Sequence, residues 1–273
     1  MATGKVRKAV IPAAGLGTRF YPLTRAQPKE MLPVLDKPII HYVVEEAVNS
    51  GLDEILIVVG AGKDSIINYF DSNTMDGKFA NHGFEELPDI YFVRQKKQLG
   101  LADSIKYAEK FVDGEPFVVL LGDTIYRSNT DKTVLSQIRS TFDKWGSPTI
   151  AIEKVPRNKI GDYGIVSGTQ LDTVSWEITS LVEKPRPEEA PSDMGITGTY
   201  ILTESIFPAI RKLKPGKNGE YQLTDALSII SNEERLVGSL FSGTRYDIGT
   251  KELWVRAFFE FAKDDERFRH LIS

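Results

Sequence analysis

Two glycines, an arginine and a lysine stand close together in the stretch VIPAAGLGTRFYPLTRAQPKEMLPV, residues 10–34. The stretch opens with apolar residues typical of a short buried strand, and Gly15 and Gly17 follow at its end. A glycine-rich turn after a strand presents a row of backbone N–H groups, which is a general way to hold phosphate oxygens. Arg19 and Lys29 would add positive charge to this turn. The stretch therefore predicts a phosphate-binding loop.

Two better-known phosphate loops fit the chain poorly. The dinucleotide fingerprint needs a third small residue for close helix packing, but Phe20 stands at that position and Pro22 interrupts any helix that begins nearby. The run VVGAGKDS resembles a P-loop, yet Ile57 and Asp64 stand where that motif requires a glycine and a hydroxyl residue. An NAD-dependent dehydrogenase is therefore disfavoured. A tight turn without a ligand would explain the glycines, but it would not explain the two basic residues.

Composition limits the partners and the chemistry. The chain has 273 residues, a net charge of −4 and no cysteine, which excludes disulfides and thiolate metal sites. An acidic chain argues against a dedicated nucleic-acid or membrane-surface protein. The histidines at 41, 82 and 270 are scattered and no G-x-S-x-G motif occurs, which leaves little basis for a covalent nucleophile. The first ten residues contain no secretory signal, so we expect a cytoplasmic protein.

Short apolar runs alternate with segments of helical period through the first half of the chain. KAVIPA, EILIVVG, IYFVRQ, PFVVLLGD and PTIAIEKV have the β-branched content of strands buried on both faces, and helical periodicity follows Pro38 and Gly100. This alternation predicts a doubly wound α/β domain with a mostly parallel sheet. Residues 72–88 are polar and unperiodic, which predicts a surface excursion. After Pro156, YGIVSG and WEITSLVEKP are expected to pair as strands, TGTYILT to form another, and helices to follow.

Motifs along nearly the whole chain resemble those of the sugar-phosphate nucleotidylyltransferases. The run IPAAGLGTRFYPLTRAQPKEMLPVLDKPIIHYVVEEAV is similar to the family signature, and PKEMLP is similar to the bacterial-type UTP:glucose-1-phosphate uridylyltransferases in particular. The resemblance continues, in order, through VRQ at 93–95, LLGD at 120–123, YGIV at 163–166, VEKP at 182–185, QLTDAL at 222–227 and RYDIGTK at 245–251.

The resemblance implies one α/β domain over residues 1–273, with a Rossmann-like, mostly parallel mixed sheet flanked by helices and a smaller sugar-side β/α lobe. Within it, residues 1–155 would form a nucleotide-binding core, 156–245 a sugar-binding part and 246–273 a C-terminal helical segment. The implied reaction is attack of the phosphate of glucose 1-phosphate on the α-phosphorus of UTP, in line with the departing pyrophosphate. A phosphate monoester has a second pKa near ~6, so the attacking group needs no general base. Such a reaction requires charge neutralisation and alignment of two polyanions, with Mg²⁺ as the implied cofactor.

The family's phosphate and metal positions match particular residues of this chain. Arg19, Lys29, Asp123 and Lys184 would be catalytic, and Asp123 and Asp247 would hold Mg²⁺, because two carboxylates plus phosphate oxygens suit a hard octahedral ion. The loop residues that would wrap the triphosphate are Ala13, Ala14, Gly15, Gly17 and Thr18, and Glu30 is also implied as a substrate contact.

The base and the sugar also have matching positions. Gln95 would read the pyrimidine, because an amide can both donate to a carbonyl and accept from a ring N–H, and Gly100 would contact the base through its backbone. Gly164, Glu183 and Lys184 would meet the sugar phosphate. Alternation on a strand sends the last two to opposite faces, so both reach a ligand only if the chain bends near the proline that follows.

Some positions depart from the uridylyltransferase pattern. This chain has GLADS where that branch usually has G-L-G-H-A, and Ala102 is similar to the thymidylyltransferase relatives; Asp193 stands where asparagine is common. A dTTP-using enzyme for the same sugar phosphate is therefore one alternative. A non-catalytic nucleotide-sugar sensor is another, although it would not need the leaving-group and metal residues.

The C-terminal segment ELWVRAFFEFAKDDERFRHLI has an apolar helical face formed by Leu253, Ala257, Phe258 and Phe261. This face predicts a helix packed on the main domain. The family resemblance implies subunit contacts here, with Trp254 or Phe259 buried between chains of a homodimer or homotetramer.

Overall fold

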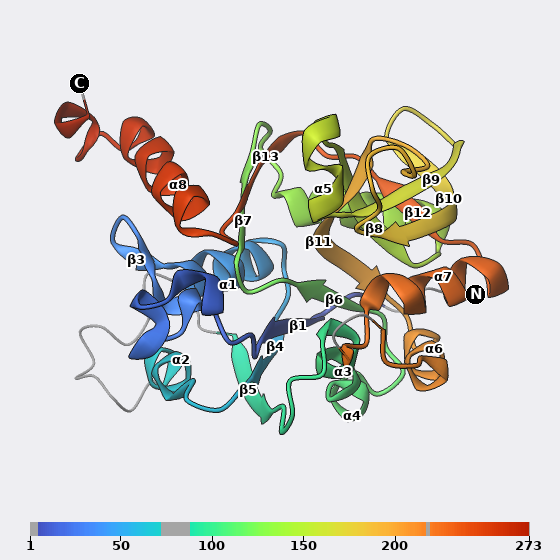
Figure 1. Cartoon of the computed structure of the whole chain (residues 1–273), viewed down its shortest axis with the longest axis horizontal. Helices are drawn as coiled ribbons and strands as arrows, with labels where there is room; N and C mark the ends of the chain where they lie inside the picture. Colours follow the sequence, from blue (N-terminus) through green and yellow to red (C-terminus); the bar gives the residue numbers. More distant parts are fainter. Residues whose placement is uncertain (1–4, 72–87, 217–218, 273) are drawn as a thin grey trace.

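In a computed structural model of the chain, which describes residues 5–71, 88–216 and 219–272, one nine-stranded sheet runs through the molecule in the order β5-β4-β1-β6-β11-β8-β12-β10-β9 (Figure 1). Its first strands are β1 (Lys8–Ala13), β4 (Glu54–Val59), β5 (Asp89–Arg94) and β6 (Phe117–Leu120). These four pair in parallel, as predicted. Their order puts the first strand of the chain inside the sheet, with all four carboxyl ends at one edge, where α/β proteins bind their ligands.

The rest of the sheet corrects the prediction that the strands are mostly parallel. The added strands are β8 (Thr149–Lys154), β9 (Gly164–Gln170), β10 (Ser175–Glu183), β11 (Met194–Leu202) and β12 (Val237–Ser239). β11 pairs antiparallel with β6, β8 and β9, and β10 pairs antiparallel with β9 and β12. Every residue of β11 is buried. A strand buried on both faces has the same apolar pattern whether it runs parallel or antiparallel to its neighbour. The apolar runs therefore could not reveal the antiparallel direction of these strands.

Helices cover both faces of the sheet. One face packs against α1 (Ile39–Asn49), α2 (Asp64–Phe70) and α5 (Val134–Trp145). The other packs against α3 (Leu101–Lys106), α4 (Glu109–Val112), α6 (Ile206–Lys212) and α7 (Leu223–Glu233). Within β1, Val10 packs in the second of these cores and Ile11 in the first, as strand alternation requires. The result is a three-layer α/β fold.

Smaller elements complete the site edge and the C-terminus. β7 (Thr124–Ser128) pairs antiparallel with β13 (Gly243–Asp247), and β2 (Pro33–Val34) pairs with β3 (Lys37–Pro38). The helix α8 (Lys251–Asp264) packs beside β2 and β13 and carries the C-terminus away from the sheet (Figure 1). The short 3₁₀ helices are Thr18–Phe20, Leu23–Arg25, Lys29–Met31, Arg157–Asp162 and Arg269–Leu271.

Most predicted elements are present. The helix after Pro38 is α1, the pair of strands predicted after Pro156 is β9 and β10, and the strand TGTYILT lies in β11. The helix predicted after Gly100 is divided into α3 and α4. The excursion predicted over 72–88 lies almost wholly outside the described residues. None of the helices in the described ranges is long and apolar enough to cross a membrane.

Candidate active site

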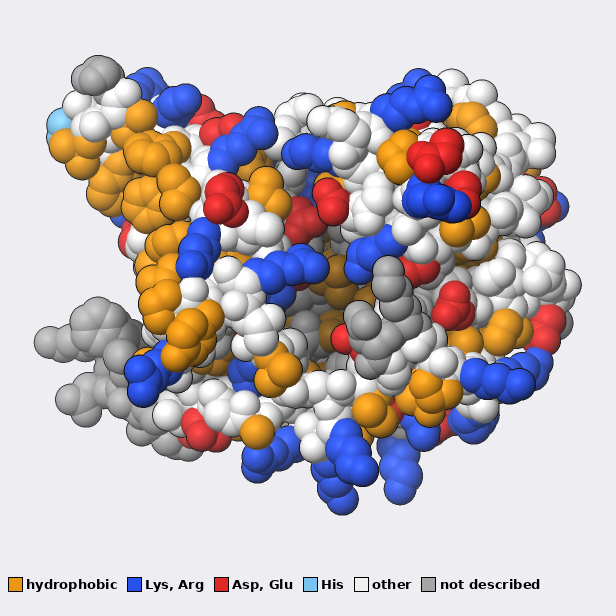
Figure 2. All heavy atoms as spheres, viewed as in Figure 1, with side chains coloured by type: hydrophobic (Ala, Val, Ile, Leu, Met, Phe, Trp, Pro, Cys, Tyr) orange, Lys and Arg blue, Asp and Glu red, His pale blue; other side chains and the backbone are white. Residues whose placement is uncertain are grey.

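A cavity of about 400 Å³ lies at the carboxyl edge of the parallel strands. Of the residues singled out in the sequence, those that line it are Gly17, Thr18, Arg19, Lys29, Asp123, Gly164, Glu183, Lys184 and Asp247. Figure 2 shows a hollow in the middle of one face of the molecule, with acidic and basic side chains gathered around it. Residues far apart in the sequence thus form one charged cavity, as the predicted strand edges require.

The loop after β1 has a conformation that only glycine adopts easily. Gly17 has φ of +65°, and a Cβ there would lie 3.1 Å from Thr24 Cγ2. The Thr24 hydroxyl donates to the carbonyl of Gly17 at 2.8 Å, and the 3₁₀ helix Thr18–Phe20 begins directly afterwards. Phe20 is buried, which explains why no third glycine stands here: its ring fills the core beneath the loop.

The rest of the loop lies at the end of β1. Ala13 and Ala14 are buried, Gly15 is exposed, and none of these three lines the cavity. The Gln98 side-chain amide donates to the Ala14 carbonyl at 2.7 Å, and a Cβ on Gly60 would lie 2.8 Å from the same oxygen. The connection after β4 therefore holds the loop after β1 by close backbone contact.

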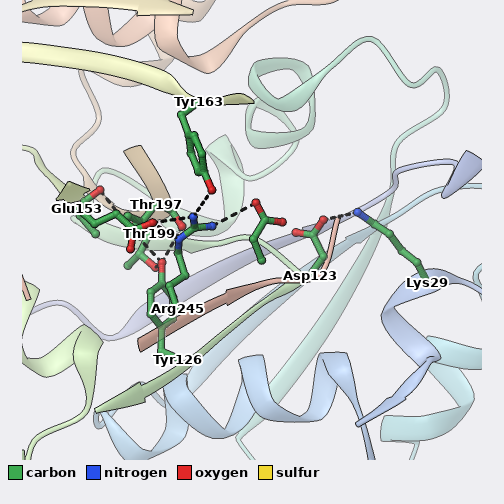
Figure 3. Close-up of polar contacts among 10 residues, drawn as sticks. Lys29, Asp123, Tyr126, Glu153, Tyr163, Thr197, Thr199 and Arg245 are labelled. Carbon is green, nitrogen blue, oxygen red and sulfur yellow. Dashed lines mark hydrogen bonds and ion pairs between the residues drawn. The ribbon is translucent and has the colours of Figure 1, made fainter. Parts of the chain in front are cut away.

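Lys29 and Asp123 form an ion pair across the cavity (Figure 3). Lys29 comes from the short helix Lys29–Met31, and Asp123 follows the end of β6. Burial works against the charged ammonium, but the carboxylates of Asp123 and Glu30 outweigh it, so the pKa of Lys29 is raised above its usual value. Lys29 therefore stays a cation at neutral pH.

Asp247 lies next to Asp123 because of the β7–β13 pairing. Asp247 stands opposite Thr124 in that pair, and the N–H of Ile248 donates to the carbonyl of Asp123 at 2.9 Å. Within the described residues, no cluster of three or more potential ligand side chains occurs. Two neighbouring carboxylates on one cavity wall fit Mg²⁺, which keeps several waters and commonly takes substrate phosphate oxygens as further ligands.

Arg245 joins Asp247 to the opposite wall, and the sequence motifs alone gave it no role. Its guanidinium lies 3.2 Å from Asp247 and 2.7 Å from Glu153, and it donates to the Tyr163 hydroxyl at 2.8 Å (Figure 3). Burial disfavours its charge, but Glu153 and Asp247 raise the pKa of Arg245 well above its usual value. Arg245 stands two residues before Asp247, so strand alternation places both on the same face of β13. This spacing could have identified Arg245 as a site residue from the sequence.

The chain bends directly after β10, as expected if both Glu183 and Lys184 reach the cavity. β10 ends at Glu183, and Lys184 takes φ of +45°, so the bend lies at Lys184 itself rather than at Pro185. The N–H of Lys184 donates to the Tyr163 carbonyl at 3.0 Å, and the Thr224 hydroxyl donates to Glu183 at 2.7 Å. Both charged side chains therefore line the same cavity.

Gly164, at the start of β9, lines the cavity beside Thr224 of α7. A Cβ there would lie 3.0 Å from the Thr224 hydroxyl and 3.2 Å from Glu183 Oε2. The position is therefore too crowded for a larger side chain. Thr224, inside the quoted motif QLTDAL, is a further site residue that the motif analysis did not single out.

Besides Ala13, Ala14 and Gly15, three more residues predicted to bind substrate, Glu30, Gln95 and Gly100, lie outside the lining of this cavity. Glu30 is 1% exposed and forms an ion pair of 2.7 Å with Lys63, so its carboxylate is engaged within the protein. Gln95 is 4% exposed and lies beside Gly100, to whose carbonyl it donates at 3.4 Å. The neighbour of Gly100, Leu101, does line the cavity.

Residues 8–266 match the family model described as nucleotidyl transferase. The chain is 44% identical over 258 residues to the UTP–glucose-1-phosphate uridylyltransferase YngB of Bacillus subtilis, an alignment that covers 90% of this chain and 86% of that protein. Among solved structures, it resembles a UDP-glucose pyrophosphorylase complexed with UDP-glucose, with a TM-score of 0.90 and 39% identity over 96% of this chain and 100% of that one. It also resembles a UTP-bound UGPase from Acinetobacter baumannii, with a TM-score of 0.88 and 31% identity over 98% of this chain and 99% of that one. The family model matches nearly the whole chain, whose glycine loop lies at the same cavity as Asp123 and Asp247, and the chain belongs to the nucleotidyl transferase family.

Proposed function

We propose that this protein transfers the uridylyl group of UTP to glucose 1-phosphate, giving UDP-glucose and pyrophosphate. The observation that carries the proposal is the single cavity that brings Lys29, Asp123 and Asp247 together with Glu183 and Lys184. It provides charge for a triphosphate on one wall and polar groups for a sugar phosphate on the other. The names of the YngB relative and of the UDP-glucose pyrophosphorylase structure specify this nucleotide and this sugar, and the Acinetobacter baumannii structure is UTP-bound.

The chemistry needs positioning more than proton transfer. The sugar phosphate attacks the α-phosphorus, the bond to the bridging oxygen of pyrophosphate breaks, and the leaving group departs as an anion. Arg19 and Lys29 neutralise the β- and γ-phosphates, and Lys184 neutralises the attacking phosphate. Mg²⁺ held by Asp123 and Asp247 would supply further charge neutralisation at the reacting phosphates.

Other residues, in the cavity lining or outside it, select the substrates. The backbone from Ala13 to Thr18 wraps the triphosphate, Gln95 and Gly100 contact the base, and Gly164 and Glu183 contact the sugar. Glu30 acts indirectly, because its ion pair with Lys63 holds the turn that carries Lys29. The core over 1–155 thus binds the nucleotide in a Rossmann-like arrangement, 156–245 forms the smaller sugar-side lobe, and 246–273 is the C-terminal helical segment.

A dTTP-using enzyme is the second candidate, and GLADS is the feature that favours it. In the structure, Ala102 is fully buried in the core beneath the sheet. It does not line the cavity, so the substitution gives only weak support for dTTP.

Pyrophosphate release tests the proposal directly. The purified protein is incubated with Mg²⁺ and glucose 1-phosphate, and UTP, dTTP, CTP, ATP and GTP are compared side by side. We expect UTP to be preferred. Comparable or faster use of dTTP would favour the second candidate, and no release with any triphosphate, also with galactose and mannose phosphates, would favour a nucleotide-sugar sensor.

We also propose that the chain acts in the cytoplasm as a homodimer or homotetramer. Trp254 is held within its own chain, since its indole N–H donates to the Pro33 carbonyl at 2.8 Å, whereas Phe259 is 50% exposed. Phe259 is therefore the better candidate for a subunit contact. Light scattering on the wild type and Phe259→Ser should show a smaller mass for the variant; a monomeric wild type would contradict the proposal.

A further inference from the structure

Gln95 is held in one place by its backbone. It follows the end of β5, and its N–H donates to the carbonyl of Val59 at 2.9 Å, continuing the parallel pairing with β4. Its side chain is almost completely buried. The amide can therefore change what it presents to a ligand only by turning its oxygen and nitrogen around.

Two neighbours decide which way the amide points, and both can only accept. The Gln95 Nε2 lies 2.7 Å from Asp103 Oδ2 and 3.4 Å from the Gly100 carbonyl. A carboxylate and a carbonyl have no proton to give, so the NH₂ group must face them and the oxygen must point away. In the described part of the chain, no hydrogen bond to Gln95 Oε1 is formed.

We propose that Asp103 is a specificity-determining positioning residue, which fixes the Gln95 amide so that its oxygen accepts the N3–H of uracil. The inference rests on the proposed function, in which Gln95 reads the base. Uracil carries a proton on N3 and can donate it to the amide oxygen. N3 of cytosine carries no proton and is itself an acceptor, so it would form no hydrogen bond with that oxygen. An amide free to turn could bind uracil or cytosine. With its orientation fixed by Asp103, it favours a base that carries a proton on N3.

A purely structural role for Asp103 makes a different prediction. Asp103 lies in the first turn of α3, where a carboxylate favours the helix N-terminus. If that were its only role, its removal would change stability and leave base preference untouched. The α3 helix has only six residues, and the Asp103 carboxylate reaches outside it to Gln95, eight positions earlier.

The variant that separates these roles is Asp103→Asn, which keeps the shape and adds a donor. The new amide can accept from or donate to Gln95, so the Gln95 amide is free to turn and offer its NH₂ to cytosine. The matched control is Asp113→Asn, the same chemical change at an exposed position just after α4. Equilibrium binding of UTP and CTP without sugar phosphate is measured for all three proteins, together with their thermal unfolding.

We expect Asp103→Asn to reduce the preference for UTP over CTP by about tenfold, the effect of one lost buried hydrogen bond, and Asp113→Asn to keep it. An unchanged preference in a folded Asp103→Asn protein would overturn the inference. The wild type supplies an independent test with N3-methyl-UTP, which lacks the N3 proton. We expect it to bind at least tenfold more weakly than UTP, and equal binding would also overturn the inference.

Binding and turnover distinguish the two proposals. A protein that prefers UTP in binding and loses that preference in Asp103→Asn, but releases no pyrophosphate, would contradict only the proposed function. A protein that turns over UTP and keeps its preference in Asp103→Asn would contradict only the role of Asp103.

Discussion

Most charged side chains of the candidate site are paired with one another. Lys29 is paired with Asp123, Arg245 with Glu153 and Asp247, and Lys184 with Glu183 at 3.3 Å. Such pairing offsets the cost of removing these charges from water. A bound polyanion would then replace Asp123 and Glu183 as the partners of Lys29 and Lys184, because neither lysine is unpaired beforehand.

Asp123 gives the clearest residue-level prediction. We expect Asp123→Asn to lower pyrophosphate release by about a hundredfold or more, the range for losing one electrostatic group at a reacting centre, while UTP still binds. Both properties are measured across a Mg²⁺ titration. The control is Asp89→Asn, an exposed carboxylate at the amino end of β5. Near-normal turnover in Asp123→Asn would contradict its metal role.

At the scale of elements, Arg245 joins three parts of the fold. It lies on β13, its partner Glu153 lies on β8, and Tyr163 directly precedes β9. Figure 3 shows its guanidinium directed between these side chains. The wall that carries Asp247 is thereby tied to β8 and to the start of β9.

Arg245→Gln should destabilise the protein strongly. The Arg245 side chain is only 6% exposed, and its removal leaves the partly exposed carboxylates of Glu153 and Asp247 without their cation, so the free energy of unfolding should fall by about 1.5–3 kcal/mol. Urea unfolding measures the loss. Arg256→Gln removes an exposed pair with Glu260 on α8 and should cost only about 0.3–0.5 kcal/mol. Equal losses of unfolding free energy in the two variants would show that burial of Arg245 does not increase its contribution to stability.

The β9–β10 hairpin makes a prediction about acid stability. At its turn, Asp172 accepts from the N–H groups of Val174 at 2.9 Å and Ser175 at 2.7 Å, and from Lys144 at 2.5 Å. These donors, Lys144 foremost, lower the pKa of Asp172. A lowered pKa stabilises the fold above the unfolded value of about 3.9, and this contribution is lost as the pH falls below it.

Asp172→Asn keeps the acceptor oxygen and removes the charge. We expect the variant to be less stable than the wild type at neutral pH, by a small amount because Lys144 is exposed, and the difference to shrink steadily as the pH falls below about 3.9. Urea unfolding over this pH range checks the trend. A stability difference that persists in acid would show that the charge is not its source.

The whole molecule is acidic, with a net charge of −4, so attraction for a triphosphate must be local. Arg19, Lys29 and Lys184 place positive charge in the cavity lining, and we expect this charge to provide the attraction. Long-range steering by the protein's overall charge would oppose an anionic substrate. Selectivity for the nucleotide therefore has to come from contacts within the site.

Ligand binding should accordingly stabilise the whole fold in a nucleotide-dependent way. At a UTP concentration about 100 times its dissociation constant, in the presence of Mg²⁺, the free energy of unfolding should rise by about 2.7 kcal/mol. Thermal unfolding with UTP and with GTP at the same concentration checks this. GTP should shift the transition much less, and equal shifts would indicate that only the phosphates are recognised.

Local patterns were enough to predict the elements and much of the site. Apolar runs revealed the core strands, the proline before residue 39 preceded α1, and the glycines after β1 predicted a special backbone. Gly17, Lys29, Asp123 and Asp247 were each found from a strand end or a motif, and all four line one cavity. These features depend on neighbours a few residues away, which a sequence displays directly.

Only the tertiary structure decided the contacts between distant segments. Three such contacts join residues that are far apart in the chain. They are the antiparallel pairing of β11 with β6, the ion pair of Lys63 with Glu30, and the position of Arg245 between two carboxylates. A strand's periodicity is the same whichever partner it meets, and a lysine's sequence context does not reveal its carboxylate. The sequence by itself determined which residues are apolar, flexible or charged, and packing determined which of them meet, because pairing energies depend on contacts that only the folded chain makes.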